Sequence, residues 1–235
     1  MAGPSDPTRT LALLEEPVED PWILVPLGNP GEAYADTRHN LGRLLLQRWL
    51  EVHCPRAAPL HRFSTGTLYG LRDPFLALVP GTYMNLSGQV VAEALAAGFA
   101  LERMILLHDD KDLPLGYGRL RTRGSDGGHN GLKSVFAAAG TEDVARLRLG
   151  IGPIQRPLHD FVLQPWTEEE WDRIDGLDNP FARFLALLAE GHALQQAMGT
   201  INADRFWRTD PAPPEAPPCP TPAPEAPCKP DSMPC

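Results

Sequence analysis

Short apolar runs alternate with amphipathic stretches between residues 21 and 210 of the chain. Apolar runs bounded by turn residues are typical of buried strands, and apolar positions three or four residues apart are typical of helices. On this basis the sequence predicts strands at Trp22–Leu27, Thr67–Leu71, Phe75–Val79, Met104–His108, Gly118–Arg123 and Ala145–Ile151, and helices at Leu41–His53, Gly88–Gly98, Leu132–Ala139 and within Thr167–Met198. This alternation indicates an α/β fold, a single domain in which helices flank a twisted mixed β-sheet.

The two ends of the chain lack this pattern. Residues 1–20 carry five acidic residues and one arginine and predict a flexible acidic leader that Pro21 ends. Residues 211–235 contain eleven prolines and an imperfect PEAP repeat, so they cannot pair in a sheet or continue a helix. We therefore expect a folded domain at 21–210 and a disordered tail at 211–235.

Composition narrows the class of protein. The apolar runs are far shorter than the roughly 20 residues that a membrane span requires, and the N-terminus lacks the pattern of a signal peptide. Cys54 is the one cysteine outside the tail, so a structural disulfide framework is not expected. These features predict a cytoplasmic protein that does not contact a membrane.

The net charge of −9 argues against a nucleic-acid partner until its distribution is considered. Residues 119–156 hold seven basic and three acidic residues, a net charge of +4, whereas residues 157–210 carry a net charge of −6. Much of the acidity therefore lies away from a basic segment in the middle of the chain.

Four polar clusters follow predicted strands, where an open α/β sheet usually binds its ligand. They are LGNPGEAYADTRHN (27–40), PGTYMNLSG (80–88), HDDKDLPLG (108–116) and GSDGGHNG (124–131). Taken singly, each has an ordinary explanation: a turn with a structural His39, a helix cap at Asn85, a solvated acidic turn, and a flexible glycine-rich loop. The acidic cluster also fits a metal site, and the glycine-rich loop fits an anion site at a helix start.

In this order, and followed by RLRLGIG (146–152), the clusters resemble bacterial-type peptidyl-tRNA hydrolase. The resemblance is motif by motif from Trp22 to Leu163 and looser to Asn202, and it does not cover the leader or the tail. It implies hydrolysis of the ester that joins a peptide to the 3′-terminal ribose of tRNA, by a monomer that needs no cofactor and no metal. The implied partner is peptidyl-tRNA, bound at its acceptor end and phosphate backbone.

The resemblance assigns the reaction to three residues. His39 matches the catalytic base, and histidine is the side chain whose ordinary pKa lies near the working pH. Asp109 matches the carboxylate that orients this base and stabilises its charged form. Asn29 matches an active-site asparagine that helps to distinguish peptidyl-tRNA from free aminoacyl-tRNA.

Six further residues match binding positions. Asn85 and Asn130 match asparagines that hold the peptide near the ester, where amide groups offer donors and an acceptor without a charge. Tyr34 and Tyr83 match aromatic residues beside the terminal nucleotide, where stacking tolerates any base. Arg121 and Arg148 match a basic pair that contacts tRNA phosphate; the ordinary alternative is that they keep a sheet edge soluble.

The chain departs from the family pattern in three places. Pro26 replaces a usual glycine and predicts a first strand that is bulged or free on one side. Asp110-Lys111 replaces Glu-Leu, which adds a charge beside the base. The segment Pro153–Asp160 is short, with Arg156 as its one basic residue, which weakens the expected tRNA contact there.

Two other functions fit parts of the sequence. A non-catalytic RNA-binding relative with the same fold would keep the site and act through a partner surface. A metal-dependent esterase would use His108, Asp109, Asp110 and Asp112, but adjacent residues on one turn cannot all converge on an ion with good geometry.

Overall fold

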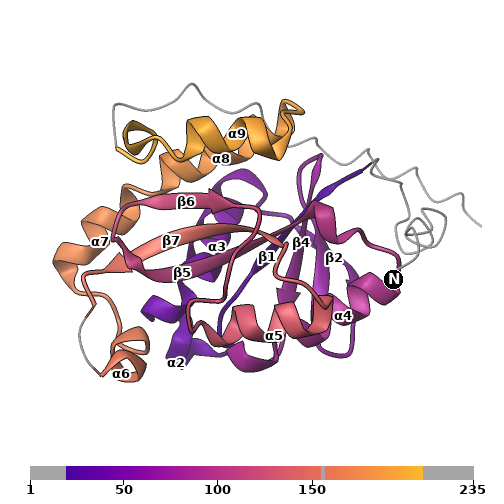
Figure 1. Cartoon of the computed structure of the whole chain (residues 1–235), viewed down its shortest axis with the longest axis horizontal. Coiled ribbons are helices and arrows are strands. Elements are labelled where there is room, and N and C mark those ends of the chain that lie inside the picture. Colours follow the sequence, from indigo (N-terminus) through magenta and orange to yellow (C-terminus); the bar gives the residue numbers. More distant parts are fainter. Residues whose placement is uncertain (1–19, 155–156, 209–235) are drawn as a thin grey trace, which may run out of the picture.

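Strand β1 (Trp22–Pro26) lies at the centre of a seven-stranded sheet whose order is β2-β3-β4-β1-β5-β7-β6 (Figure 1). The computed structural model describes residues 20–154 and 157–208 of the chain. The other strands are β2 (Ala58–Arg62), β3 (Gly66–Gly70), β4 (Phe75–Pro80), β5 (Met104–Pro114), β6 (Gly118–Arg121) and β7 (Ala145–Gly152). The predicted leader, apart from Asp20, and the predicted tail lie outside the described residues.

The sheet is mixed, as the sequence predicts. Strand β1 pairs in parallel with β4 and β5, and β5 pairs in parallel with β7. The pairs β2–β3, β3–β4 and β6–β7 are antiparallel. Because β1, β4, β5 and β7 run in the same direction, their carboxyl ends meet at one edge of the sheet, and the loops that follow them gather there.

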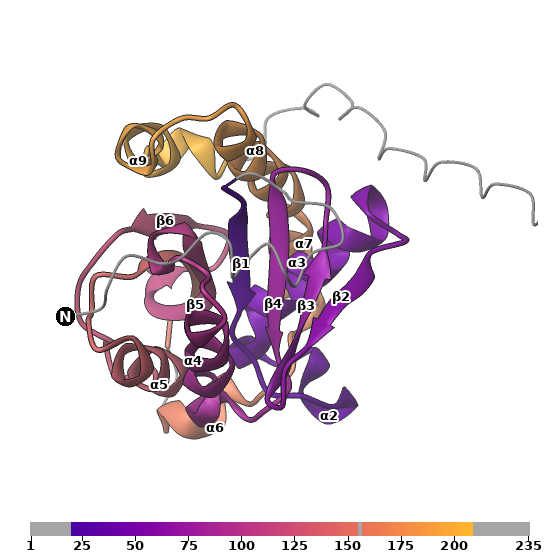
Figure 2. The same ribbon diagram turned by 90° about the vertical axis from the view of Figure 1, so that its right-hand side faces the viewer.

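Helices cover both faces of the sheet (Figures 1 and 2). On one face lie α4 (Gly88–Ala96) and α5 (Asn130–Ala139). On the other lie α3 (Leu41–His53), α7 (Glu168–Asp175), α8 (Asp178–Ala189) and α9 (Leu194–Ile201). Two short helices, α2 (Glu32–Ala35) and α6 (Leu158–Val162), lie near the carboxyl edge. Within the described part of the chain, the helices are too short or too polar to cross a membrane.

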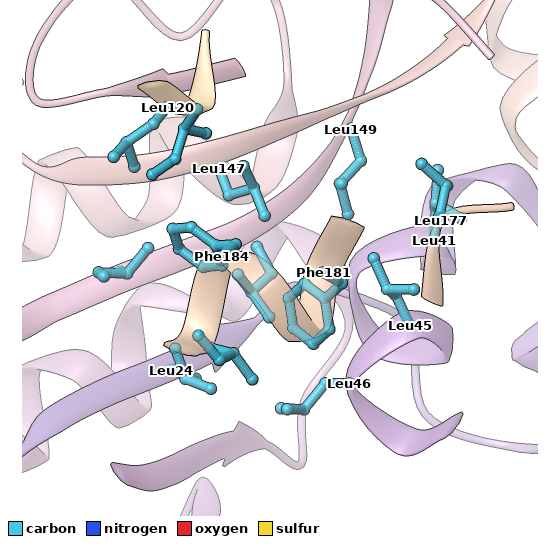
Figure 3. Packing of buried hydrophobic residues seen from close by; sticks show 14 of the residues in the cluster. Leu24, Leu41, Leu45, Leu46, Leu120, Leu147, Leu149, Leu177, Phe181 and Phe184 are labelled. Carbon is cyan, nitrogen blue, oxygen red and sulfur yellow. The ribbon is translucent and has the colours of Figure 1, made fainter. Parts of the chain in front are cut away.

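The core has two layers because successive side chains of a strand point to opposite faces. Leu24 joins the layer under α3 and α8, where Phe181 and Phe184 are fully buried (Figure 3). Val25 joins the opposite layer with residues of α4 and α5. Burial of each large apolar side chain contributes about 1.5–3 kcal/mol, so both layers hold the sheet rigid beneath its carboxyl edge.

Strand β5 differs most from its prediction. The sequence predicts a strand that ends at His108 and a solvated acidic turn after it, but β5 continues to Pro114, with a shift of register against β7 between Asp110 and Pro114. The predicted acidic turn is therefore wrong: these aspartates lie on a strand, where Asp109 is buried and Asp110 pairs with Arg148 of β7, and only Asp112 is exposed. Propensity disfavours aspartate in strands, and tertiary pairing overrides it here.

Two other elements differ from prediction. Strand β2 was not predicted, because its side chains are mostly exposed and it contains Pro59, so it lacks a strand's apolar pattern. The C-terminal helical part is three helices, α7, α8 and α9, with breaks near Gly176 and Gly191. Thr167, the first residue of the predicted helical part, caps α7 in a reciprocal capping box with Glu170.

Pro26 leaves β1 free on one side, which is one of the two predicted outcomes. Its pairing with β5 continues regularly through Pro26 and Leu27, whose backbone N–H donates to Leu107 at 2.9 Å. The pairing with β4 extends only from Trp22 to Leu24. A bulge at Pro26 is therefore wrong, and the missing donor of proline lies where the strand has already parted from β4.

Candidate active site

A cavity of about 900 Å³ opens among the loops at the carboxyl edge of the sheet. All nine residues that the sequence singles out as catalytic or binding residues line it: Asn29, Tyr34, His39, Tyr83, Asn85, Asp109, Arg121, Asn130 and Arg148. Within it we distinguish a histidine cluster, made of His39, Asp109 and His129, from an arginine cluster, made of Arg121, Arg146 and Arg148.

Close packing of α3 on β5 brings His39 to Asp109. His39 lies in a single 3-10 turn, Arg38–Asn40, that leads into α3. Gly42 permits the approach, because a Cβ atom there would lie 2.3 Å from the backbone oxygen of Leu107. As a result Nδ1 of His39 lies 2.9 Å from Oδ1 of Asp109.

Arg38 also holds this turn in place. The sequence did not indicate this role. Its side chain is buried, forms an ion pair with Glu170 at 2.7 Å, and donates to the backbone oxygens of Gln164 and Pro165. It also lies 4.6 Å from the centroid of the Phe161 ring. Since these partners lie more than 120 residues away in the chain, no local sequence pattern indicates the role of Arg38.

His129 was also missed, and its hydrogen bonds fix the proton arrangement of the histidine cluster. It is the N-cap of α5, where its Nδ1 accepts from the backbone N–H groups of Gly131 and Leu132 at 3.1 and 3.2 Å. The ring proton must therefore lie on Nε2, which donates to Oδ1 of Asp109 at 3.0 Å. The sequence signal was present, because His129 adjoins Asn130 at the start of a helix.

The same carboxylate oxygen accepts from both histidines, which sets the tautomer of His39. Nδ1–H of His39 donates to Asp109, so Nε2 of His39 carries the lone pair. Nε2 makes no hydrogen bond with any described residue. Nε2 of His39 is therefore available to take a proton from a molecule in the cavity.

The charges of the histidine cluster are mutually stabilised. Burial alone would lower the pKa of His39, but the charge and the hydrogen bond of Asp109 raise it above its ordinary value. Burial would likewise raise the pKa of Asp109, yet the charge of His39 and the hydrogen bonds of His39 and His129 hold that pKa well below its usual range. Asp109 is thus ionised at neutral pH and favours the protonated form of His39.

His108 precedes Asp109 in the chain but does not belong to the histidine cluster. It is buried, and its Nδ1–H donates to the backbone oxygen of Asp109 at 2.7 Å, while its Nε2 has no partner among the described residues. Burial and the proximity of His129 lower the pKa of His108 to about 3. It is therefore neutral at physiological pH and supports the Asp109 backbone.

The three asparagines are placed differently. The side-chain oxygen of Asn29 accepts from the backbone N–H of Met84 at 2.8 Å, and Asn40 holds the Asn29 backbone by two hydrogen bonds. The side chain of Asn29 is thus fixed, and its NH₂ group remains available to a ligand. Asn85 and Asn130 are exposed in the cavity wall. The alternative that Asn85 caps a helix is wrong, since Ser87 is the N-cap of α4.

Tyr34 and Tyr83 form an aromatic pair on the cavity wall. Their ring centroids are 6.2 Å apart and the rings are nearly perpendicular, at 84°. Tyr83 is 56% exposed although it is a large aromatic side chain. Exposed aromatic faces of this kind suit the stacking of a base.

Two residues of the arginine cluster are engaged within the protein. Arg146 is buried, donates to backbone oxygens of Glu142, Val144, Gly124 and Ser125, and thereby ties the glycine-rich loop to β7. Arg148 forms an ion pair with Asp110 through its Nε atom. Arg121 has no carboxylate at ion-pair distance among the described residues. The charge added by Asp110-Lys111 thus faces Arg148 and Asp112, not His39, which corrects the expectation that it lies beside the base.

The histidine cluster also has the composition of a metal site. The ligand atoms of His39, Asp109 and His129 lie within 4.8 Å of one another, and in the described part of the chain no other such group of histidine, cysteine and acidic residues occurs. The alternative set of His108, Asp109, Asp110 and Asp112 does not converge, because Asp110 pairs with Arg148 and Asp112 with Lys111. A metal in the histidine cluster would replace the hydrogen bonds that set the His39 tautomer.

Comparison with known proteins gives consistent matches over the whole described domain. A family model described as peptidyl-tRNA hydrolase matches residues 23–209. The peptidyl-tRNA hydrolase of Moorella thermoacetica is 40% identical over 186 residues, which cover 77% of this chain and 97% of that protein. That of Chloroflexus aggregans is 43% identical over 158 residues, 63% of this chain and 82% of the relative. The crystal structure of peptidyl-tRNA hydrolase from Acinetobacter baumannii superposes with a TM-score of 0.68 at 31% identity, covering 80% of this chain and 97% of that one.

Proposed function

The chain belongs to the peptidyl-tRNA hydrolase family and hydrolyses peptidyl-tRNA, and we propose that a water molecule activated by His39 carries out this reaction. The matched family and relatives are enzymes, which favours the hydrolase over the non-catalytic RNA-binding alternative. One observation carries the proposal: the hydrogen bond from Nδ1 of His39 to buried Asp109, which leaves Nε2 free in the cavity.

The reaction needs one base that later acts as an acid. Nε2 of His39 takes a proton from water while the water oxygen attacks the carbonyl carbon of the ester. Asp109 stabilises the resulting imidazolium. When the bond from this carbon to the 3′ oxygen of the ribose breaks, His39 returns the proton to that oxygen. General acid–base catalysis of this kind contributes about 10²- to 10⁴-fold to the rate.

The asparagines suit the peptide part of the substrate. The oxygen of Asn29 already accepts from the Met84 backbone, so the NH₂ group is the part of this side chain that Asn29 offers to the ligand. A peptide carbonyl accepts from such a group, whereas the ammonium group of a free aminoacyl-tRNA has nothing to accept with. Asn29 thus favours peptidyl-tRNA. Asn85 and Asn130 hold the peptide and stabilise the negative oxygen that develops on the ester carbonyl.

The aromatic pair and the arginines suit the RNA. Tyr34 and Tyr83 stack on the terminal nucleotide, which is common to all tRNAs. Arg121 lies directly opposite Arg146 across the antiparallel β6–β7 pair, and Arg119 lies opposite Arg148. Like charges in these positions are destabilising, so their arrangement favours an anion-binding role for Arg121 and Arg148 over a merely solubilising one. Arg156 of the Pro153–Asp160 segment lies outside the described residues.

The oligomeric state and location follow the same proposal. The enzyme acts as a monomer, because one chain supplies every residue assigned above, and it acts in the cytoplasm, where tRNA is charged and used. Sedimentation of the purified protein measures the first point.

Hydrolysis of N-acetyl-aminoacyl-tRNA by the purified protein tests the function. We expect turnover of this substrate, slow or no turnover of the unblocked aminoacyl-tRNA, and loss of turnover in His39→Ala. Circular dichroism checks that this variant folds. Hydrolysis by wild type no faster than by His39→Ala contradicts the proposed mechanism.

A further inference from the structure

Asp110 lines the same cavity as the arginine cluster and forms an ion pair with one of its members, Arg148. We infer that Asp110 competes with an RNA phosphate for Arg148, so that this carboxylate weakens tRNA binding and makes the binding less dependent on salt. The inference rests on the proposed function, because it takes the phosphate backbone of tRNA as the ligand of the arginine cluster.

The ion pair is built into the sheet. Asp110 lies on β5 and Arg148 on the neighbouring strand β7, where the register pairs Asp110 with Gly150. Nε of Arg148 donates to Oδ2 of Asp110, and Oδ1 accepts from the backbone N–H of Asp112 at 2.9 Å. Both carboxylate oxygens are therefore engaged, and the side chain is only 11% exposed.

The pair is ionised on both sides. Burial alone would raise the pKa of Asp110, but the hydrogen bond and charge of Arg148, with the Asp112 backbone, lower that pKa below its ordinary value. A free Arg148 would carry a full positive charge, whereas the pair has no net charge. An approaching phosphate therefore gains little Coulomb attraction from Arg148 while Asp110 remains beside it.

The other arginines of the cluster lack such a competitor. Arg146 donates to backbone oxygens, which leave its charge in place, and Arg121 has no carboxylate partner among the described residues. Asp110 itself lines the cavity together with all three arginines, so a phosphate bound there would meet its negative charge directly. The cluster thus binds RNA with fewer effective charges than its arginines suggest.

Removal of this one charge tests the inference. The probe is deacylated tRNA, whose dissociation constant is measured over a series of salt concentrations for wild type and Asp110→Asn. We expect at least about fivefold tighter binding at low salt, and a slope of log affinity against log salt that is steeper by up to about 0.9, the value for one additional phosphate contact.

Two controls separate competition at Arg148 from a general effect of charge. Asp126→Asn removes the same charge from the lining of the same cavity, where Asp126 bonds to the Gly128 backbone, and we expect a smaller gain. In Asp110→Asn combined with Arg148→Ala, the gain should disappear. Thermal unfolding checks that each variant folds, and Asp110→Ala replaces Asp110→Asn if the latter does not.

Results that contradict the inference can be told apart from a result that contradicts the proposed function. Unchanged or weaker tRNA binding by the Asp110 variant overturns the inference, and weaker binding shows that Asp110 orients Arg148 for the RNA. A gain that persists without Arg148 also overturns it. Hydrolysis of N-acetyl-aminoacyl-tRNA by the wild type is measured in parallel, so absence of hydrolysis contradicts the proposed function while the binding series still decides the role of Asp110.

Discussion

The histidine cluster and the arginine cluster share one cavity but are held by different forces. Asp109 is 4% exposed, and both of its histidine partners donate to one carboxylate oxygen at 2.9 and 3.0 Å. In the arginine cluster, Arg121 and Arg148 are partly exposed, and the one ion pair joins Arg148 to Asp110. Buried hydrogen bonds fix positions and proton locations, whereas partly exposed charges set attraction over a distance and respond to salt.

In the proposed mechanism, this difference separates the catalytic step from RNA binding. The tautomer of His39 depends on Asp109 and, through it, on the helix cap at His129, so we expect a small change there to alter the proposed catalytic step. The net charge that the arginine cluster would present to RNA depends on how many of its arginines are neutralised. Substitutions in the two clusters should therefore change different measured quantities.

The largest effect is expected at His39. His39→Ala removes the ring nitrogen Nε2 that takes a proton from water in the proposed mechanism and should lower kcat by about 10²- to 10⁴-fold. The affinity for deacylated tRNA should stay within about twofold, because charge attraction in the arginine cluster is untouched. Equal losses of kcat and tRNA affinity would show that the two clusters do not act separately.

A smaller effect on rate, with a shift in pH dependence, is expected at Asp109. His39 must be unprotonated to act as a base, and Asp109 raises its pKa, so activity should fall as the pH drops through that raised value. Asp109→Asn removes the charge, lowers the pKa of His39 and moves this acidic limb to lower pH, while kcat falls by about 10- to 100-fold. The pH profile of kcat/KM measures the shift; an unchanged profile argues against the pairing.

The smallest effect distinguishes two arginines of one cluster. Arg121→Ala should weaken binding of all tRNAs alike and reduce the slope of log affinity against log salt by about 0.7–0.9, since phosphate contacts carry no sequence information. Arg148→Ala should reduce it less, because Asp110 already neutralises Arg148. Hydrolysis of a small N-blocked aminoacyl ester should be nearly unaffected by either. A larger slope change for Arg148 than for Arg121 would reverse the comparison.

The sequence determined the α/β class, most strands and helices, and the residues whose chemistry suits the reaction. It did so because apolar periodicity reflects which face of an element is buried, and because His39, Asp109 and the asparagines stand in short motifs with their own order. The boundaries of β1 and α3 differ from prediction by at most one residue. The sequence did not predict the edge strand β2, because its mostly exposed side chains leave no apolar pattern.

How these residues work together depends on contacts that form only in the folded protein. The role of Arg38 depends on Glu170, 132 positions away, and the role of His129 depends on Asp109, 20 positions away. The acidic run from Asp109 to Asp112 resembles a solvated turn because local propensity cannot include the Arg148 side chain on β7. Hydrogen bonds and ion pairs between distant segments exist only after the sheet forms, so the tautomer of His39 and the neutralisation of Arg148 belong to the fold and not to any motif.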